Sequence, residues 1–439
     1  MAITDKEKGV WGLDQVYNKI NQGSIWEYSG ANALYVWSRN NVGQLGQNNI
    51  TQYSSPVQIS GSNWQSSSDT SSGTYNVSAA IKTDGTLWTW GSNEYGILGT
   101  NTAHDADRSS PVQITGTTWS KVSMGNNSGA AIKTDGTLWT WGETSSNGAL
   151  GQNAPTNSHL SSPVQIPGTT WSKVSMGNQS GSAIKTDGTL WVWGYNGNGN
   201  LGQNNNINYS SPAQIPGTTW NKIESGFRRT HAIKTDGTLW SWGYGNYGYF
   251  GNNTSGPSNR VSSAVEVPGT TWSEVHDAQY HVLGLKTDGT LWAWGYDGHG
   301  ELAQNNNINY SSPAQIPGTT WSKVSSGLYS SAGIKTDGTL WTWGQTHKGQ
   351  LGQNQTSVRY SSPVQIPGTT WSSIQVTEEY AMFALKTDNT LWSWGYNNNG
   401  NLGQNNRTEY SSPVQVGSDS DWVSIKAGSH GGLVAFRNL

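Results

Sequence analysis

Three observations predict that this chain is an all-β protein with an eight-bladed β-propeller of four-stranded antiparallel blades. A tryptophan-rich block recurs roughly every 50 residues, each repeat holds four short strand patterns, and the two ends carry complementary halves of one further repeat. We therefore expect a ring closed by pairing of the N- and C-terminal strands. The propeller would occupy residues 31–439, after a short N-terminal anchoring arm, residues 1–30.

The composition fits many thin layers better than one large core. The chain is 33% hydrophobic and 12% charged, against about 45–50% and about 25% in an ordinary soluble domain. Its apolar surface is concentrated in 25 Trp and 19 Tyr, and each such side chain can bury roughly 150–250 Å². Aromatic side chains can therefore fill narrow interfaces between small sheets.

The recurring block reads K-T-D-G-T-L-W-x-W-G, and its last copy has Asp388-Asn389 in place of Asp-Gly. The copies begin at Lys82, Lys133, Lys185, Lys234, Lys286, Lys335 and Lys386. Asp-Gly between apolar segments predicts a two-residue hairpin turn in which both residues have a positive φ. Asn389 suits the second position because Asn tolerates the left-handed region.

Each repeat divides into four strand patterns. The first is W-S-K-V-S, as at residues 119–123, and the second is A-A-I-K, as at residues 130–133. The third is T-L-W-x-W, as at residues 137–141, and its two tryptophans share one face of the sheet, where we expect them to pack between blades. The fourth is P-V-Q-I, as at residues 163–166, and its proline suits an edge strand.

The chain ends predict how the ring closes. Residues 33–37 match the third strand, so the chain enters halfway through a blade. Residues 422–425 and 433–436 match the missing first and second strands. The third strand then occurs eight times, with its second tryptophan at Trp37, Trp90, Trp141, Trp193, Trp242, Trp294, Trp343 and Trp394.

The block D-G-x-L-W-x-W-G followed by G-x-L-G, as in residues 187–194 and 199–202, resembles the regulator of chromosome condensation family of propeller repeats. The resemblance covers about residues 31–439. It implies a disc that binds another macromolecule through its loops. Members of this family commonly have seven blades, so an eighth is a departure. The family includes a nucleotide exchange factor and a β-lactamase inhibitor, but no position here matches their functional residues.

The N-terminal arm has a different pattern. Its predicted docking residues are Trp11, Leu13, Val16, Tyr17, Ile20 and Trp26. Four of them, from Leu13 to Ile20, follow the i, i+3, i+4, i+7 spacing of one face of a short amphipathic helix. About ten residues do not hold a helix alone in water, so this face must dock on the disc itself or, as we favour, on a partner. Residues 9–23 are similar to the arms of tailed-phage virion structural proteins.

Strand direction predicts two faces with different roles. In an antiparallel blade, the first-to-second and third-to-fourth connections lie on one face, and the others lie opposite. The opposite face carries near-identical T-D-G-T and P-G-T-T turns, whereas the first face is variable, beginning with the loop at residues 67–75. Loops on a rigid frame commonly carry binding residues, although drift in solvated loops is the alternative. The predicted binding residues are Tyr75, Phe227, Arg228, Arg229, His231, Tyr280, His281, Tyr329, Glu378, Glu379 and Tyr380.

Sequence signatures of catalysis and cofactor binding are missing. There is no Cys, no G-x-S-x-G elbow and no phosphate-binding G-K-[ST] loop. His276 and His281, with Asp277 between them, could form a metal pair, but a solvated loop is the favoured interpretation. We therefore expect no enzyme activity, no metal and no cofactor. The net charge of −3 without basic clusters argues against nucleic acid, and the absence of long apolar runs argues against membrane insertion and a Sec signal.

Together these observations predict a non-enzymatic bacteriophage virion structural protein, either a head decoration or a tail appendage. Its arm would dock on other virion proteins, and its variable loops would be available to a host-surface glycan or protein. It would be made in the host cytoplasm and end in the extracellular particle. The alternative is a bacterial or environmental protein-binding or lectin-like propeller unrelated to virions.

Overall fold

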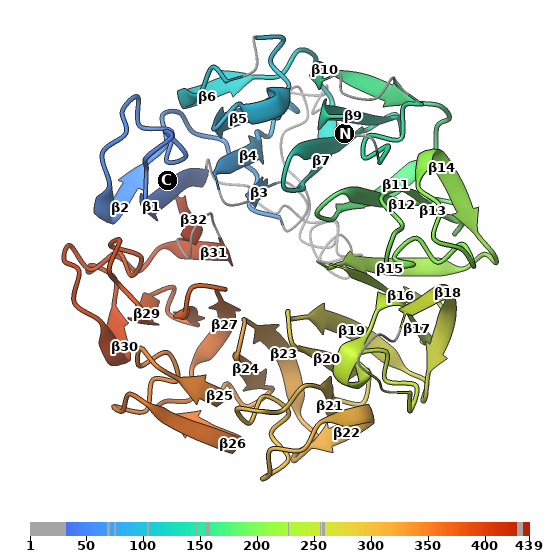
Figure 1. The fold of residues 1–439 in the computed structure, drawn as a ribbon. Coiled ribbons are helices and arrows are strands. Elements are labelled where there is room, and N and C mark those ends of the chain that lie inside the picture. Colours follow the sequence, from blue (N-terminus) through green and yellow to red (C-terminus); the bar gives the residue numbers. More distant parts are fainter. Residues whose placement is uncertain are drawn as a thin grey trace, which may run out of the picture.

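The computed structural model describes residues 32–67, 71–73, 76–102, 105–144, 147–153, 159–226, 228–254, 256, 260–427 and 433–439. In this part of the chain the strands form eight four-stranded antiparallel sheets, which stand around a central axis as the blades of a propeller (Figure 1). The predicted eight-bladed architecture is confirmed. The predicted arm, residues 1–30, lies outside the described residues. No helix among those described is long and apolar enough to cross a membrane.

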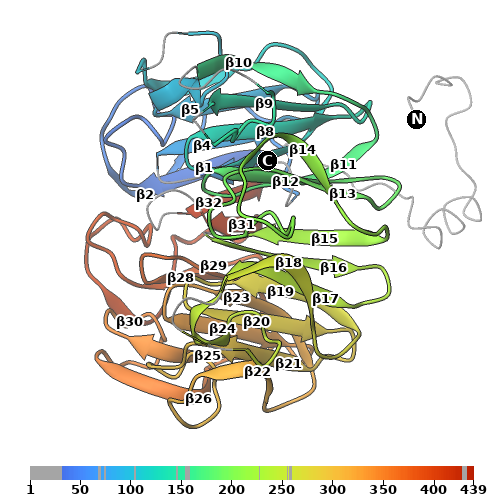
Figure 2. The ribbon, with the colours of Figure 1, turned by 45° about the vertical axis from the view of Figure 1, so that its right-hand side comes forward.

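In each blade, strands a to d run from the axis to the rim (Figure 1), and neighbouring blades lie side by side in the turned view of Figure 2. From a to d the strands are, in blade 1, β31 (Trp422–Ala427), β32 (Leu433–Asn438), β1 (Asn32–Ser38) and β2 (Tyr53–Gln58); in blade 2, β3 (Ser71–Gly73), β4 (Val77–Ile81), β5 (Leu87–Gly91) and β6 (Arg108–Gln113); in blade 3, β7 (Trp119–Met124), β8 (Ser128–Lys133), β9 (Leu138–Glu143) and β10 (His159–Ile166); in blade 4, β11 (Trp171–Met176), β12 (Ser180–Lys185), β13 (Leu190–Gly194) and β14 (Tyr209–Ile215); in blade 5, β15 (Trp220–Ser225), β16 (Arg229–Lys234), β17 (Leu239–Tyr244) and β18 (Arg260–Val267); in blade 6, β19 (Trp272–Asp277), β20 (His281–Lys286), β21 (Leu291–Gly295) and β22 (Tyr310–Ile316); in blade 7, β23 (Trp321–Ser326), β24 (Ser330–Lys335), β25 (Leu340–Thr346) and β26 (Val358–Ile366); and in blade 8, β27 (Trp371–Val376), β28 (Ala381–Lys386), β29 (Leu391–Gly395) and β30 (Tyr410–Gln415). The short 3₁₀ turns η1 (Glu94–Gly96) and η2 (Asn246–Gly248) lie in the c–d loops of blades 2 and 5.

Blade 1 closes the ring with strands from both ends of the chain. Strand β1 pairs with β2 on one side and with β32 on the other, and Leu34 lies opposite Phe436. The Arg437 guanidinium, next to Phe436, donates to the Asp421 carboxylate at 2.7 Å and to the Asp419 carboxylate at 2.8 Å. The predicted closure by pairing of terminal strands is therefore confirmed.

Tryptophan hydrogen bonds join each blade to the one before it. The second tryptophan of every strand c is buried, and its indole Nε1 donates to a main-chain carbonyl in the c–d loop of the preceding blade, at 2.7–3.1 Å. In the described chain, each of the eight hydrophobic clusters combines residues from two adjacent blades. The core therefore consists of thin interfaces, as the composition predicted.

The first tryptophan of strand c supports the repeated turn of its own blade. In blade 5, the Lys234 ammonium lies 4.7 Å from the ring of Trp220 and 4.3 Å from that of Trp240. Trp240 Nε1 donates to Thr238 Oγ1 at 3.1 Å, and Thr238 donates through its main-chain N–H and its hydroxyl to Asp236. These hydrogen bonds hold the pKa of the Asp236 carboxyl below its usual range. The Lys and Asp of the block thus have structural roles.

The geometry of the repeated turn differs from the prediction. Only the second residue of the Asp-Gly pair has a positive φ, as at Gly237 with φ +77°. The Gly237 N–H donates to the Lys234 carbonyl at 3.0 Å, which gives a type I turn followed by a left-handed glycine. The Asp236 carboxylate accepts two hydrogen bonds from Thr238, which hold its side chain in the turn. Asn389 takes the same position with φ +61°, as expected.

The first variable loop is shorter than predicted. Residues 71–73 of the expected loop 67–75 form β3, which pairs with β4 through Ser71 opposite Ala80. Trp64 bridges to Lys82 outside the named strands, whereas in blade 3 the corresponding Trp119 begins β7 itself. The inner strand of blade 2 therefore resumes after an insertion that the repeat pattern did not reveal.

Replacing Trp242 with Phe should lower the free energy of unfolding by about 2–4 kcal/mol. The change removes the indole donor that lies 2.9 Å from the buried Asn200 carbonyl, which keeps only the Thr230 hydroxyl at 3.1 Å, and it opens a small cavity. The control is Trp240→Phe, which changes a half-buried ring and should cost about 1 kcal/mol. Urea titration of both variants measures the difference. Equal losses would contradict the view that the deeper tryptophan holds adjacent blades together.

Candidate functional site

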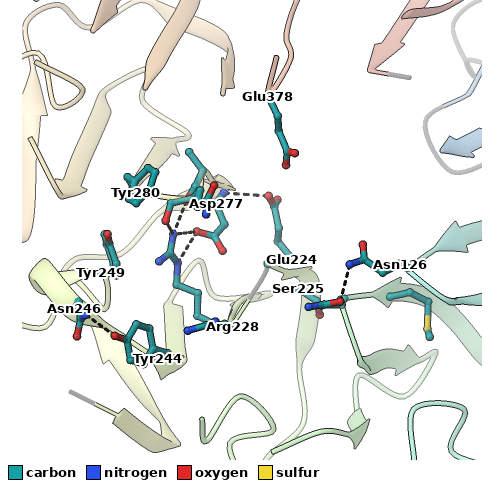
Figure 3. A pocket seen from close by; sticks show the side chains of 18 of the residues that line it. Asn126, Glu224, Ser225, Arg228, Tyr244, Asn246, Tyr249, Asp277, Tyr280 and Glu378 are labelled. Carbon is teal, nitrogen blue, oxygen red and sulfur yellow. Dashed lines mark hydrogen bonds and ion pairs between the residues drawn. The ribbon is translucent and has the colours of Figure 1, made fainter. Parts of the chain in front are cut away.

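The a–b and c–d loops lie on one face of the ring because the blades are antiparallel, and this variable face contains a pocket of about 540 Å³ near the axis. The a–b loops of blades 3, 4, 5, 6 and 8 and the c–d loop of blade 5 line it. Figure 3 shows Glu224 and Glu378 reaching the pocket from different sides of the ring. Several blades thus contribute to one cavity.

A buried ion pair across two blades forms one wall of the pocket. Arg229, the first residue of β16, donates through Nε to Asp277 Oδ1 at 2.6 Å, and their side chains are only 7% and 3% exposed. The same guanidinium donates to the main-chain carbonyls of Ala278 and Gln279 and lies 4.1 Å from the Tyr249 ring. One arginine therefore fixes the a–b loop of blade 6 and an aromatic ring of blade 5.

The carboxyl group of this ion pair and a neighbouring carboxyl group have opposite pKa shifts. Burial raises the pKa of Glu224, whose Oε1 accepts the Asp277 N–H at 3.0 Å. Burial alone would also raise the pKa of Asp277, but the Arg229 guanidinium and the nearby His231 hold it below its usual range. The wall therefore keeps an ionised carboxylate bound to arginine, next to a carboxyl group that ionises less readily.

Aromatic rings extend from the pocket over blades 5 to 7. We call Tyr247, Tyr249, Tyr280, Tyr296, His299 and Tyr329 the aromatic platform. Tyr280 and Tyr329, from adjacent a–b loops, are stacked with ring centroids 4.9 Å apart and an interplanar angle of 7°. Tyr247 is 46% exposed and lies 5.2 Å from Tyr296. Rings from four loops are thus in contact with one another, and all of them except the buried Tyr249 are partly exposed.

The structure brings together part of the predicted binding set. Arg228, Arg229, Tyr280 and Glu378 line the pocket, and Tyr329 joins it through its stacking on Tyr280. In the next a–b loop, Glu379 accepts from Asn401 Nδ2 at 3.5 Å, and Tyr380 lies 6.4 Å from His347. Tyr75 and Phe227 lie outside the described residues, as do the arm residues Trp11 to Trp26.

The predicted placement of two histidines in exposed loops is wrong. His231 lies within β16 and His281 begins β20, and neither has any exposed surface. His231 Nδ1 lies 2.6 Å from Ser241 Oγ, and His281 Nε2 lies 2.7 Å from Ser331 Oγ of the next blade. Burial lowers the pKa of His281 to about 3. Strand b begins earlier than the repeat pattern indicated, so these side chains face blade interfaces.

Buried polar contacts near the pocket superficially resemble a catalytic relay. Ser241 Oγ contacts His231, whose Nε2 lies 3.8 Å from Asp277 Oδ1. A nucleophile must reach its substrate, but Ser241 lies inside β17 with no exposed surface, and Asp277 is already paired with arginine. His276 faces Glu274 instead. His276 and Asp277 end β19 and His281 begins β20, so the loop expected at residues 276–281 is confined to residues 278–280. Among the described residues no group of three or more His, Asp or Glu side chains could hold a metal.

Several residues of the pocket and the aromatic platform were not among those predicted. Glu224 on an inner strand and Tyr247 and Tyr249 in a c–d loop line the pocket. Tyr296 and His299, in another c–d loop, belong to the platform. A comparison of c–d loops could have found His299, because it replaces Asn198 in an otherwise similar stretch of blade 4. No comparable signal marks Glu224, since inner strands vary at that position.

Models of known protein families match most of the chain. Residues 28–317 match the RCC1-like domain. Residues 337–377 and 388–434 match the Regulator of chromosome condensation (RCC1) repeat, as do residues 321–350 in a second model of that repeat. The matches run through the blocks on which the resemblance was first noted.

Two curated proteins are similar over part of this chain. The Ultraviolet-B receptor UVR8 of Arabidopsis thaliana is 26% identical over 168 residues, which are 38% of this chain and 38% of that protein. The human E3 ubiquitin-protein ligase HERC2 is 26% identical over 179 residues, which are 40% of this chain and 4% of that protein. The alignments thus span well under half of either relative.

Solved structures share the fold at low identity. Human WBSCR16 aligns with a TM-score of 0.61 and 18% identity, covering 93% of this chain and 99% of that chain. A structure of Kap60 bound to yeast RCC1 (Prp20) aligns with a TM-score of 0.62 and 13% identity, covering 94% and 90%. Prp20p of Saccharomyces cerevisiae, described with its binding to Gsp1p and histones, aligns at 0.61 and 15%, covering 85% and 92%. At these identities the likeness shows the fold alone.

Replacing Arg229 with Gln should lower the free energy of unfolding by about 3–5 kcal/mol, because Asp277 would remain buried without its partner. Urea titration at neutral pH measures the loss. Replacing both residues, as Arg229→Met with Asp277→Leu, should recover most of it. The adjacent exposed Arg228, changed to Gln, is the control and should cost much less. A double variant as unstable as the single one would contradict the assignment of the loss to an unpaired charge.

Proposed function

This chain belongs to the RCC1-like domain family, and from that premise we propose that it is a non-enzymatic binding protein whose variable face holds a partner macromolecule. The observation that carries the proposal is the aromatic platform beside the 540 Å³ pocket. Tyr and Arg are the residue types enriched where binding energy is concentrated. The contact surface would comprise the platform with Arg228, Glu378, Glu379 and Tyr380, supported from below by Arg229, His231 and His281.

The preformed geometry of this face suits binding. Tyr280 and Tyr329 are already stacked, and Arg229 already fixes the loop that carries Tyr280. Side chains held in place before contact lose less conformational entropy on binding. Kap60 with RCC1, and Gsp1p and histones with Prp20p, are named as partners of similarly folded proteins, which supports a protein partner as one class; a host-surface glycan is the other.

We further propose that the protein is a virion component docked by residues 1–30, as a head decoration or tail appendage. Support comes from the arm's sequence pattern and its similarity to phage arms. The first described residue, Asn32, lies at the start of β1, on the face of the uniform b–c turns. An arm that approaches from there would leave the variable face available. A bacterial or environmental binding propeller remains the alternative.

The change Tyr280→Ala or Tyr329→Ala should weaken binding by about 30-fold, because each removes half of the stacked pair. Labelled full chain is applied to glycan and cell-surface protein arrays, and any hit is titrated with each variant. Tyr360→Ala, on the outer strand β26 of the same blade as Tyr329, is the control and should bind normally. If both platform variants bind the hits with the affinity of the unchanged chain, this assignment of the binding surface is refuted.

Deletion of residues 1–30 should abolish incorporation into particles and leave array binding unchanged. Mass spectrometry of purified particles, from hosts producing the full or shortened chain, measures incorporation. Absence of the full chain from particles would eliminate the virion role. Array binding that persists in that case would favour the alternative function.

A further inference from the structure

The c–d loops of blades 1, 4 and 8 share a framework built on a carboxamide. Asn196 in blade 4 accepts the Leu201 N–H with its Oδ1 at 2.9 Å and donates its Nδ2 to the Asn205 carbonyl at 2.9 Å. Asn40 in blade 1 and Asn397 in blade 8 make the same two contacts. In each of these loops the amide oxygen therefore accepts from the main chain, and the amide nitrogen donates to at least one main-chain carbonyl.

A second carboxamide closes the same loop from the other side. In blade 7, Gln350 accepts the Lys348 N–H with its Oε1 at 2.9 Å and donates its Nε2 to the Gln345 carbonyl at 2.9 Å. In blade 4, Asn200 donates its Nδ2 to the Tyr195 carbonyl at 2.7 Å. Here too the donor half of the amide binds the main chain.

Blade 6 has carboxylic acids at both places. Its loop, residues 296–304, aligns with residues 195–203 of blade 4, and the next six residues, N-N-N-I-N-Y, are identical in the two blades. Asp297 replaces Asn196 and Glu301 replaces Asn200, and neither acid has exposed surface. Asp297 Oδ1 still accepts the Leu302 N–H at 2.8 Å, and Glu301 Oε2 still accepts the His299 N–H at 2.7 Å.

The other oxygen of each acid lacks a donor. Asp297 Oδ2 and Glu301 Oε1 are buried and make no hydrogen bond within the described residues. By the loop alignment they occupy the places of the Asn196 and Gln350 amide nitrogens, which face main-chain carbonyls. A carboxylate oxygen beside a carbonyl oxygen is repelled, whereas a protonated carboxyl group can donate there. Buried polar groups are nearly always hydrogen-bonded, so the geometry calls for a proton on each acid.

The charged groups around the loop do not replace these protons. Arg359, from β26 of blade 7, donates to the Gly298 carbonyl at 3.2 Å and is the cation that faces Glu301. Burial lowers the pKa of His299, and Arg359 and His347 of blade 7, which face it, lower this pKa further. Burial raises the pKa of Asp297 to about 7. Burial also raises the pKa of Glu301 to about 7. Main-chain donors and Arg359 lower this pKa, and the nearby Asp297 adds to the rise.

We infer that Asp297 and Glu301 are neutral carboxylic acids in the folded protein, each donating its proton to a main-chain carbonyl, so that the blade 6 c–d loop is a proton-dependent support of the aromatic platform. Tyr296 and His299 belong to this loop. The Glu301 carbonyl also accepts the Trp343 indole N–H at 2.8 Å. The loop thus joins the platform to the interface between blades 6 and 7.

The direction of the pH effect follows from the numbers of protons that the closed loop and the opened loop bind. In the opened loop the two acids would have ordinary pKa values of about 3.9 and about 4.3, below those of the closed loop. The closed loop therefore holds extra protons between about pH 4 and about pH 7, and its stability falls as pH rises through that window. Above about pH 7 the loss is complete.

Hydrogen–deuterium exchange of the free full-length chain tests this inference. Protection of residues 296–304, divided by that of the blade 4 loop 195–203 and corrected for intrinsic exchange, should fall at least about ten-fold from about pH 5 to about pH 8. In the variant Asp297→Asn with Glu301→Gln the ratio should stay constant. In Asn196→Asp a decrease should appear in the blade 4 loop as well, relative to the protection of that loop in the unchanged chain.

Parallel pH profiles of the two loops in the unchanged chain would overturn the inference, and so would a decrease that persists in the double variant. A decrease removed by a chelator would also overturn it, because a bound cation would then replace the protons. Folding of each variant is verified by its far-ultraviolet spectrum, and Asn196→Asp provides an answer if the double variant does not fold. No partner is present, so the result is independent of the proposed binding function.

Discussion

The indole-to-carbonyl hydrogen bond between neighbouring blades is the interaction on which the rest of the structure depends. Each blade is a small sheet that could not bury enough apolar surface alone. The deep tryptophan supplies both the apolar area and the donor that satisfies a carbonyl in the c–d loop of the preceding blade. Because the c–d loops form part of the variable face, the same hydrogen bonds that hold the ring together also fix the backbone beneath the site.

This dependence separates the two faces of the ring. The face with the b–c turns uses its Lys, Asp and Thr side chains on tryptophan rings and on the turn itself, which leaves little there to vary. On the variable face the hydrogen bonds from the deep tryptophans fix the loop backbones and leave the loop side chains free to differ between blades. Arg229 and Asp277 link two such loops across a blade boundary. The rings of the aromatic platform belong to loops that are positioned in this way. The conserved framework within the repeat thus permits different side chains at the loop tips.

The repeat made the architecture predictable, because a periodic block reports blade number, strand order and closure directly. Local geometry was harder to predict from the sequence. The Asp-Gly turn has one positive φ because Thr238 holds the Asp side chain. Within the site, Tyr280 and Tyr329 could be named from sequence, but their stacking depends on the angle between adjacent blades. His231 and His281 were misplaced because the start of strand b leaves no mark in the repeat. Glu224 and the c–d loop tyrosines are far apart in the sequence, and only the curvature of the ring brings them to the same region of the variable face.

Pairing of β1 with β32 has a consequence for how the chain folds. Leu34 and Phe436 are partners, so the contact that completes the ring joins strands from opposite ends of the described chain. Contacts of such long sequence separation form slowly. During synthesis, β1 can pair with β2 while its other edge waits for β32, which is made after the strands of blades 2 to 8. An open edge of this kind also accepts a strand from another copy, so the rate of chain completion and the local concentration of nascent chains both influence whether rings close on themselves.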